Sequence, residues 1–263
     1  MYKLNHFAAR HRHLMKVLTT ILWFGFWTVL SVYLHVNYII CGICAIVCAG
    51  VYLIWVEAAP QHIMLKASEK YTKECDPYPL LSETEKILSY DLSEANRQLA
   101  LMNKSMALSG AGRNGEAYDI LASLNIDKLA GTPYVTKIVY YNNIMDFTTR
   151  LSRFDEAERA YEKMMQLYGD MKDSKQKKAL EGTVACAHYM AMYRRGEYMK
   201  AIELINAIEP TSPSMKVDNA LFYAKCCIAL GDVERARETL NFVCENGNRL
   251  CFVDEAREIL KAI

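Results

Sequence analysis

Cys41-Gly-Ile-Cys44 has the spacing of a redox dithiol, and Cys48 adds a third thiol four residues later. A redox pair needs a helix N-terminus that lowers a thiol pKa and access for a partner. Here both thiols lie inside a long apolar run that holds no Asp, Glu, Lys or Arg. We therefore interpret these cysteines as small packing residues, with redox chemistry as the alternative.

Gly110-Ala-Gly112-Arg-Asn-Gly115 matches the GxGxxG pattern of dinucleotide-binding loops. Such a loop needs a strand before the glycines and a helix after them. Here the preceding segment, Leu99–Leu108, has a helical pattern. The sequence therefore predicts a turn between two helices at this point, and no nucleotide cofactor.

Histidine and cysteine spacings do not favour a metal centre. His6, His11 and His13 could bind a metal as a short tract, but a basic interfacial arm over residues 1–16 is the better interpretation. The cysteines after residue 56 form neither a CxxC pair nor a zinc spacing; they are Cys75, Cys186, Cys226, Cys227, Cys244 and Cys251. We predict structural thiols and no metal.

Catalytic motifs are also scarce. The sequence has no HExxH, Walker A or GxSxG pattern. Asp146, His188 and Lys225 are the only candidates for an unfamiliar active site, and nothing in their spacing brings them together. His188 lies where a bulky buried residue is expected. The sequence predicts a protein that is not an enzyme.

The strongest signal is the apolar run itself, Val17–Val56, which is 40 residues long. One membrane span needs about 20 apolar residues to cross roughly 30 Å of hydrocarbon, and a signal-peptide core has only about 7–15. The run therefore predicts a transmembrane hairpin with spans at 17–36 and 38–56. The polar break between them falls at His35 and Asn37.

Small residues in this hairpin have helical spacing and would allow close packing of the two spans; they are Cys41, Ala45 and Ala49 in the second span and Gly25 in the first. The N-terminal flank is basic and the hairpin loop has no Lys or Arg. Because cytoplasmic flanks carry the excess of Lys and Arg, both termini are expected in the cytoplasm. We interpret the membrane as a bacterial cytoplasmic membrane.

Residues 57–263 hold all 30 acidic residues and 27 of the 31 basic residues, a balance that does not favour nucleic acid as a partner. Their pattern is periodic and rich in helix formers. Four segments share a turn residue, an Ala five residues later, and bulky residues four and seven positions beyond that Ala. They are Gly112/Ala117/Leu121/Leu124, Ser152/Ala157/Tyr161/Met164, Gly196/Ala201/Ile205/Ile208 and Gly231/Ala236/Leu240/Val243.

These segments resemble the tetratricopeptide repeat (TPR) family. The clearest matches are LGDVERARETL (Leu230–Leu240), RRGEYMKAIELI (Arg194–Ile205) and LSRFDEAERAYEKM (Leu151–Met164), and GAGRNGEAYDIL (Gly110–Leu121) is a looser one. The family repeats about every 34 residues, whereas the alanines here are 40, 44 and 35 residues apart. We place the insertions at Leu129–Pro133 and Gly169–Ser174.

The resemblance implies an all-α chain: the membrane hairpin, then an α-solenoid of about four TPR-like helix pairs over 95–263. A single helix, Asp254–Ile263, would cap the last pair. Residues 57–94 are expected to form juxtamembrane helices, as a degenerate repeat or a stalk. One of these would lie near His62–Lys73, and the other would start at the capping box Ser82-Glu83-Thr84-Glu85.

In this family the first helices of the pairs line a concave groove. Carried over by position, the groove residues are Met102, Met106, Asn142, Asp146, Cys186, Met190, Tyr193, Leu221 and Lys225. Such a mixed, Met-rich surface suits an apolar helix or peptide, although some of these residues could instead pack against neighbouring helices. The basic run Lys172–Lys178 is expected to be the solvated start of a long helix, or a contact to an anionic surface.

Together these features predict a membrane-tethered TPR adaptor that binds a protein or peptide partner at the cytoplasmic face, without catalysis. The alternative is a self-associating membrane scaffold or assembly protein that has no dedicated groove ligand. The lipid bilayer is a partner in either case. The identity of the protein partner does not follow from a resemblance of fold.

Overall fold

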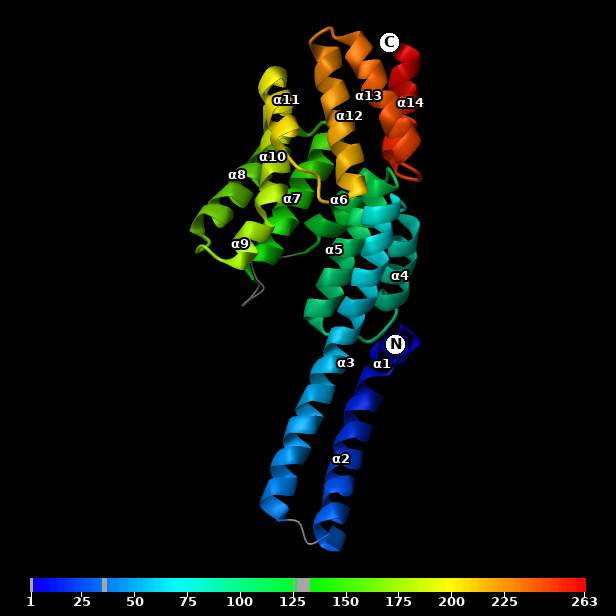
Figure 1. The fold of residues 1–263 in the computed structure, drawn as a ribbon, viewed down its shortest axis with the longest axis vertical. Helices are drawn as coiled ribbons and strands as arrows, with labels where there is room; N and C mark the ends of the chain where they lie inside the picture. The colour runs from blue at the N-terminus through cyan, green and yellow to red at the C-terminus, as the bar shows by residue number, and fades with distance from the viewer. Residues whose placement is uncertain (1, 35–36, 125, 127–132) are drawn as a thin grey trace. The chain divides into compact units, whose positions relative to one another are not determined.

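The structure is a computed structural model that describes residues 2–34, 37–124, 126 and 133–263. These residues form fourteen α-helices and no strand (Figure 1), so the predicted all-α class is confirmed. The chain divides into two compact units, Met1–Ala67 with Ser82–Ala100 and Ser68–Leu81 with Leu101–Ile263.

The first unit contains two helices that are long and apolar enough to cross a membrane, α2 (Arg12–Leu34) and α3 (Tyr38–Glu74). The most apolar 18-residue stretch has a mean hydropathy of 1.5 in α2 and 2.6 in α3. Only 6% of the stretch in α2 and 22% of the stretch in α3 is buried. The core helix of a water-soluble domain would hide such a surface. Two apolar helices were predicted here, and His35 and Val36 at their junction lie outside the described residues.

The helix that contains the second predicted span continues beyond Val56. The sequence predicts a separate helix near His62–Lys73, but the structure joins this segment and the second predicted span into the single helix α3. The physical reason is that this segment is rich in Ala, Lys and Glu and contains no turn signal other than Pro60. A proline removes one backbone N–H, and here the helix continues through it.

The predicted packing residues of the second span, Cys41, Ala45 and Ala49, are all buried along α3. That prediction is confirmed. The prediction for Gly25 is wrong, because a Cβ at this position would meet nothing within 4 Å. Gly25 therefore faces open space and does not mediate a close approach.

Helices α1 (Tyr2–Arg10), α4 (Tyr78–Leu88) and α5 (Glu94–Gly110) also contribute to the first unit. Helix α4 begins four residues before the predicted capping box at Ser82. The Asp76 carboxylate (Oδ1) accepts a hydrogen bond from the backbone N–H of Tyr78 at 3.0 Å, so Asp76 and Pro77 supply the start signal instead. The core of this unit consists of Ala8, Ala9, Ala59, Ile63, Met64, Ile87, Leu92 and Ala100.

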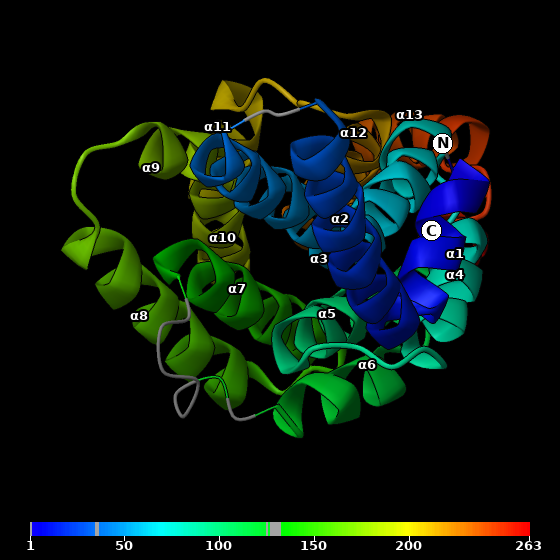
Figure 2. The same ribbon diagram turned by 90° about the horizontal axis from the view of Figure 1, so that it is seen from below.

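The second unit is built mainly from α6 to α14. Their bounds are α6 (Asn114–Ala122), α7 (Tyr134–Arg150), α8 (Phe154–Asp170), α9 (Lys175–Ala179), α10 (Glu181–Arg194), α11 (Tyr198–Ala207), α12 (Pro213–Ala229), α13 (Val233–Asn246) and α14 (Cys251–Ala262). Consecutive helices pack as pairs, α7 on α8, α10 on α11 and α12 on α13. Figure 2 shows α8 alongside α7. Helix α10 also contacts α7 and α12, and α14 packs on α12 and α13.

All four predicted turn residues adopt the left-handed conformation, with φ of 82° at Gly112, 59° at Ser152, 76° at Gly196 and 80° at Gly231. After each, the next backbone N–H donates to the carbonyl five residues back. These bonds join Arg113 to Leu108, Arg153 to Thr148, Glu197 to Met192 and Asp232 to Cys227, at 2.8–2.9 Å. This is the Schellman motif, which ends a helix at a residue tolerant of positive φ.

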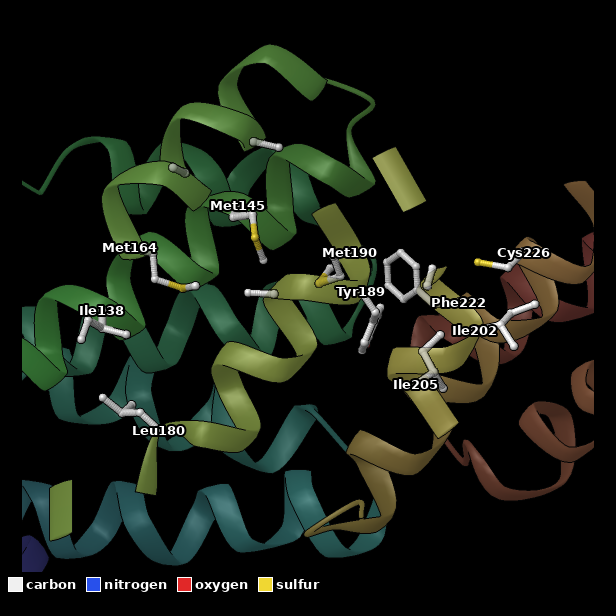
Figure 3. Packing of buried hydrophobic residues seen from close by; sticks show 14 of the residues in the cluster. Ile138, Met145, Met164, Leu180, Tyr189, Met190, Ile202, Ile205, Phe222 and Cys226 are labelled. Atoms are coloured by element: carbon white, nitrogen blue, oxygen red, sulfur yellow. The ribbon is translucent and has the colours of Figure 1, made fainter. Parts of the chain in front are cut away.

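The alanine five residues after each turn is fully buried, at Ala117, Ala157, Ala201 and Ala236. The repeat seen in the sequence is therefore a repeat of backbone geometry and packing. A continuous core joins the pairs, with Met145, Met164, Tyr189 and Phe222 among its members (Figure 3).

The basic run from Lys172 does not begin one long helix: Ser174 caps the short helix α9 by accepting a bond from the Lys177 backbone N–H at 3.2 Å, and α10 starts separately at Glu181. Of the predicted insertion Leu129–Pro133, only Pro133 lies within the described residues, where it is the N-cap of α7.

Candidate functional site

The second unit contains a solvent-open cavity of about 570 Å³. Its polar lining comes chiefly from α7, α10 and α12, that is, from the first helix of each packed pair. Tyr71 of α3 and Phe252 of α14 add aromatic surface. A cavity of this size and mixed lining has room for one or two side chains of a ligand.

A buried charge network lies in the wall of this cavity. The guanidinium of Arg150 contacts a carboxylate oxygen of Asp146 at 2.8 Å and one of Asp218 at 2.8 Å. Only 6% of the Arg150 side chain is exposed. One cation thus holds two carboxylates, and the network carries a net negative charge when all three groups are ionised.

Helix geometry explains how these groups meet. Asp146 and Arg150 are four residues apart on α7, so their side chains lie on one face. Asp218 comes from α12, and α10 packs against both of these helices. The rings of Phe222 and Phe252 lie 5.6 and 4.5 Å from the guanidinium carbon, which fixes the planar head by cation–π contact.

Burial governs the protonation of the network. It raises the pKa of Asp146 to about 6, with the like charge of Asp218 adding to the shift and Arg150 opposing it. The two carboxylates in turn hold the pKa of Arg150 above its usual range. Burial also raises the pKa of Cys186 to about 12, so this thiol in the cavity wall is protonated at neutral pH.

A second polar cluster packs behind the cavity wall. The hydroxyl of Tyr189 donates to Asn219 Oδ1 at 3.0 Å, and Cys186 Sγ lies 3.9 Å from the same oxygen. Asn219 is buried, and its amide nitrogen has no hydrogen-bond partner among the described residues. A buried donor left unpaired costs free energy unless a ligand or water satisfies it.

Four of the predicted groove residues line this cavity together: Asn142, Asp146, Cys186 and Met190. Tyr193 and Lys225 instead line a second cavity of about 380 Å³. Arg150 belongs to the lining of both cavities. The predicted groove surface is therefore divided into two spaces in the structure.

The remaining three groove residues do not fit the expectation. Leu221 is fully buried and Met102 is 5% exposed, and neither residue lines either of these two cavities. Met106 is half-buried and lies outside the lining of both cavities. The direction in which a side chain points depends on how far its helix is rotated about its own axis. A residue at a groove position of the family can therefore face the neighbouring helix instead.

Sequence reasoning missed the central residue, Arg150, and its second partner, Asp218. It also missed two exposed carboxylates in the cavity lining, Glu181 and Glu209. The spacing of Asp146 and Arg150 was a usable signal, because an oppositely charged pair at i and i+4 on an otherwise half-buried helix indicates a paired charge. No local signal points to Asp218, which is 68 residues away from Arg150.

The three candidate catalytic residues do not form one cluster. His188 Nδ1 is hydrogen-bonded to the hydroxyl of Tyr161 at 2.8 Å, and Lys225 pairs with Glu255 at 2.5 Å. The Asp146 carboxylate forms an ion pair with the Arg150 guanidinium. Burial lowers the pKa of His188, so the imidazole is neutral at pH 7.

The other motifs fall into structural places. The GxGxxG glycines lie at the end of α5, in the Schellman turn and in α6, as expected for a turn between helices. His6 contacts Tyr90 and Glu83, whereas His13 contacts Asp91. No group of three or more His, Cys, Asp or Glu suited to a metal occurs in the described part of the chain.

Comparison with models of known protein families, with curated proteins and with solved structures gives no match to this chain. The cavity, the charge network and the apolar hairpin are the features of the chain that indicate a function.

Proposed function

We propose that this protein is a membrane-tethered helical-repeat adaptor of the TPR type, which binds a segment of a partner protein in the cavity around Arg150. The observation that carries the proposal is the cavity of about 570 Å³, because its polar lining comes mainly from the first helices of successive pairs. In this reading the protein performs no catalysis.

The charge of the lining indicates which partner segment fits best. Four carboxylates, those of Asp146, Glu181, Glu209 and Asp218, face only two cations, those of Arg150 and Lys178. The apolar part of the wall includes Met190, Met215 and Phe252. A segment that combines a basic side chain with an apolar one would complement both surfaces.

The hairpin supports the membrane tether. Its apolar side chains face outward, and water would penalise such a surface by about 25 cal/mol for each Å² exposed. Glu57, at the end of the second apolar run, pairs with Lys16 and with Arg12 (3.2 Å), just before the first run. This pairing brings both ends of the hairpin together, as expected when both lie on one side of the bilayer.

The first test measures binding of defined peptides to the full-length protein in lipid nanodiscs. One probe is a labelled nonapeptide of alternating lysine and leucine, and the other replaces each lysine with glutamate. We expect the lysine peptide to bind more tightly. The double variant Glu181→Gln/Glu209→Gln should weaken that binding by roughly tenfold, about 1.4 kcal/mol, because two carboxylates that face the ligand are removed.

The matched control is Glu162→Gln/Glu234→Gln. It removes two exposed carboxylates outside the cavity lining, and Glu234 lies in the first turn of its helix, like Glu181. The control should bind like the wild type. Equal binding by all three proteins, or a preference for the glutamate peptide, would show that the cavity is not a site for a basic segment.

A crosslinked pull-down from native membranes then asks what occupies the site in the cell. A partner that is captured by the wild type and the control, but lost from the cavity variant, supports the adaptor. Recovery of only the chain itself, unchanged by the variant, would favour the self-associating scaffold.

A further inference from the structure

Helix α1 has one face in the core of the first unit and one face outside it. Asn5, Ala8 and Ala9 are buried. On the opposite side Leu4 is 52% exposed and Phe7 is 50% exposed. These two large apolar side chains are three residues apart, so they form one patch on the helix surface.

The apolar patch continues along the chain into α2. Leu14, Val17 and Leu18 are also exposed, and they lead directly into the apolar surface of the hairpin. Figure 1 shows α1 at the end of the hairpin where α2 begins. Residues 2–16 contain no acidic side chain. An exposed face that is apolar, continuous with a membrane span and flanked by basic residues is typical of an interfacial helix.

A pocket of about 460 Å³ opens beside α1. It is lined by Arg10, Lys86, Ser89, Tyr90 and Asp91. Asp91 contacts His13 at 2.6 Å. Arg10 and Lys86 are exposed, and neither forms an ion pair with any residue that the structure describes. The pocket thus offers two uncommitted cations to a ligand.

The place of these cations along the chain suggests the ligand. Arg10 lies seven positions before the apolar run that starts at Val17. Lys86 lies close to His6 of α1. Burial lowers the pKa of the His6 imidazole, and the positive charge of Lys86 lowers it further. With the hairpin in the bilayer, Arg10 and Lys86 lie near the level of the lipid phosphates, so this step rests on the proposed membrane tether.

We propose that α1 lies in the membrane interface and that Arg10 and Lys86 bind the phosphate of an anionic phospholipid. Leu4 and Phe7 enter the boundary between headgroups and acyl chains. Exposed cations near an anionic leaflet contribute to lipid binding, and the arginine fork suits a phosphate geometrically. The occupant is a bilayer lipid rather than free phosphate, because Arg10 in the pocket lining and the apolar patch of Leu4 and Phe7 are on the same helix, α1.

The test uses the full-length protein in mild detergent and counts retained lipids by native mass spectrometry. The probes are phosphatidylglycerol, phosphatidylcholine and inorganic phosphate. We expect retention of phosphatidylglycerol over phosphatidylcholine. The double variant Arg10→Gln/Lys86→Gln should lower the affinity for phosphatidylglycerol roughly 5- to 30-fold.

The matched control, Arg159→Gln/Lys163→Gln, also removes one Arg and one Lys, from an exposed position on α8. It should retain phosphatidylglycerol like the wild type. Equal retention by all three proteins would overturn the proposal. Competition by millimolar inorganic phosphate as effective as that by the lipid would show a site for free phosphate instead.

A second variant tests the apolar patch. Leu4→Ser/Phe7→Ser should weaken lipid retention without changing the oligomeric mass; a lower oligomeric mass would show that a second copy of the chain covers this face, and would overturn the proposal. Alkaline carbonate extraction separates this inference from the proposed function. If the protein stays in the membrane but shows no lipid preference, only the inference fails; if carbonate releases it, the tether itself is wrong.

Discussion

Arg150 is a buried guanidinium that holds carboxylates from two helices, α7 and α12. Taking three charges out of water is expensive, and such a network is balanced only while all of its members are present. The same residue lines both cavities of the second unit. Arg150 therefore links the stability of the helix pairs to the shape of the candidate binding surface.

Replacing this residue tests its structural role. Arg150→Met should lower the free energy of unfolding by about 3–5 kcal/mol, because it leaves Asp146 and Asp218 in a buried site without their cation. The measurement is urea unfolding of the full-length protein in detergent micelles, followed by circular dichroism.

The control for this experiment is Arg257→Met, which breaks an exposed pair with Asp254 on α14. That change should stay within about 0.5 kcal/mol of the wild type, because exposed ion pairs contribute little. A similar loss in both variants would mean that the network around Arg150 adds no specific stability.

Asp146 predicts how binding depends on pH. Its pKa of about 6 means that the carboxyl is ionised at pH 7 and protonated at pH 5. A basic ligand favours the ionised form, so the affinity for the lysine–leucine peptide should fall by up to about tenfold between pH 7 and pH 5. Fluorescence anisotropy across this range would measure the fall, and Asp146→Asn should remove most of it.

The sign of the linkage to stability follows from the same shift. The folded chain binds this proton more tightly than the unfolded chain, whose pKa is near the ordinary 3.8. The contribution of Asp146 to stability therefore decreases as the pH rises from 3.8 to about 6. If the lysine–leucine peptide bound more tightly at pH 5 than at pH 7, Asp146 would not belong to the wall that faces the ligand.

Single residues also show how far a sequence can predict a site. Asn142, Asp146, Cys186 and Met190 line one cavity, because each lies on the side of a first helix that faces this space. Leu221 does not line this cavity. Whether its side chain enters a groove or a core depends on how far α12 is rotated about its axis relative to the neighbouring helices. That rotation is set by tertiary packing, which no local pattern encodes.

At the scale of helices, the connections within the pairs were the most predictable feature. Each has a residue that tolerates positive φ and an Ala that lets two helices cross, and both requirements are visible in the sequence. Helix ends without such chemistry were less predictable. The extension of α3 to Glu74 and the early start of α4 at Tyr78 depend on competition between weak signals.

The turns predict opposite effects for two glycine substitutions. Gly231 has a φ of 80° and open space around the Cβ position, so Gly231→Ala adds backbone strain without a clash. We expect a loss of about 1 kcal/mol in the free energy of unfolding. Gly115 lies within α6, also with open space, so Gly115→Ala should instead stabilise the helix by about 0.5–1 kcal/mol.

Urea unfolding of both variants, with identical detergent and lipid, would measure this contrast. The two substitutions add the same methyl group, so any difference in sign comes from the backbone conformation. If Gly231→Ala is as stable as the wild type, the left-handed turn is not required at that connection, and the repeated geometry would lose its physical basis.

At the scale of the whole chain, the apolar hairpin and the polar helix pairs are suited to different surroundings. Helices α2 and α3 expose large apolar side chains, whereas the second unit buries its apolar residues in continuous cores. This division follows from composition and was predictable from the sequence. If the hairpin crosses a membrane as proposed, the Lys and Arg residues that flank it determine on which side its two ends lie.

Reporter fusions would test this orientation in bacterial cells. Alkaline phosphatase fused after Ile263 should be inactive, because it would remain in the cytoplasm, and a fluorescent protein at the same position should fluoresce. The matched fusion after Asn37, between the two predicted spans, should show active phosphatase because the first span carries it across. Active phosphatase at Ile263 with none at Asn37 would reverse the orientation, and activity at neither position would mean that the hairpin does not cross the membrane.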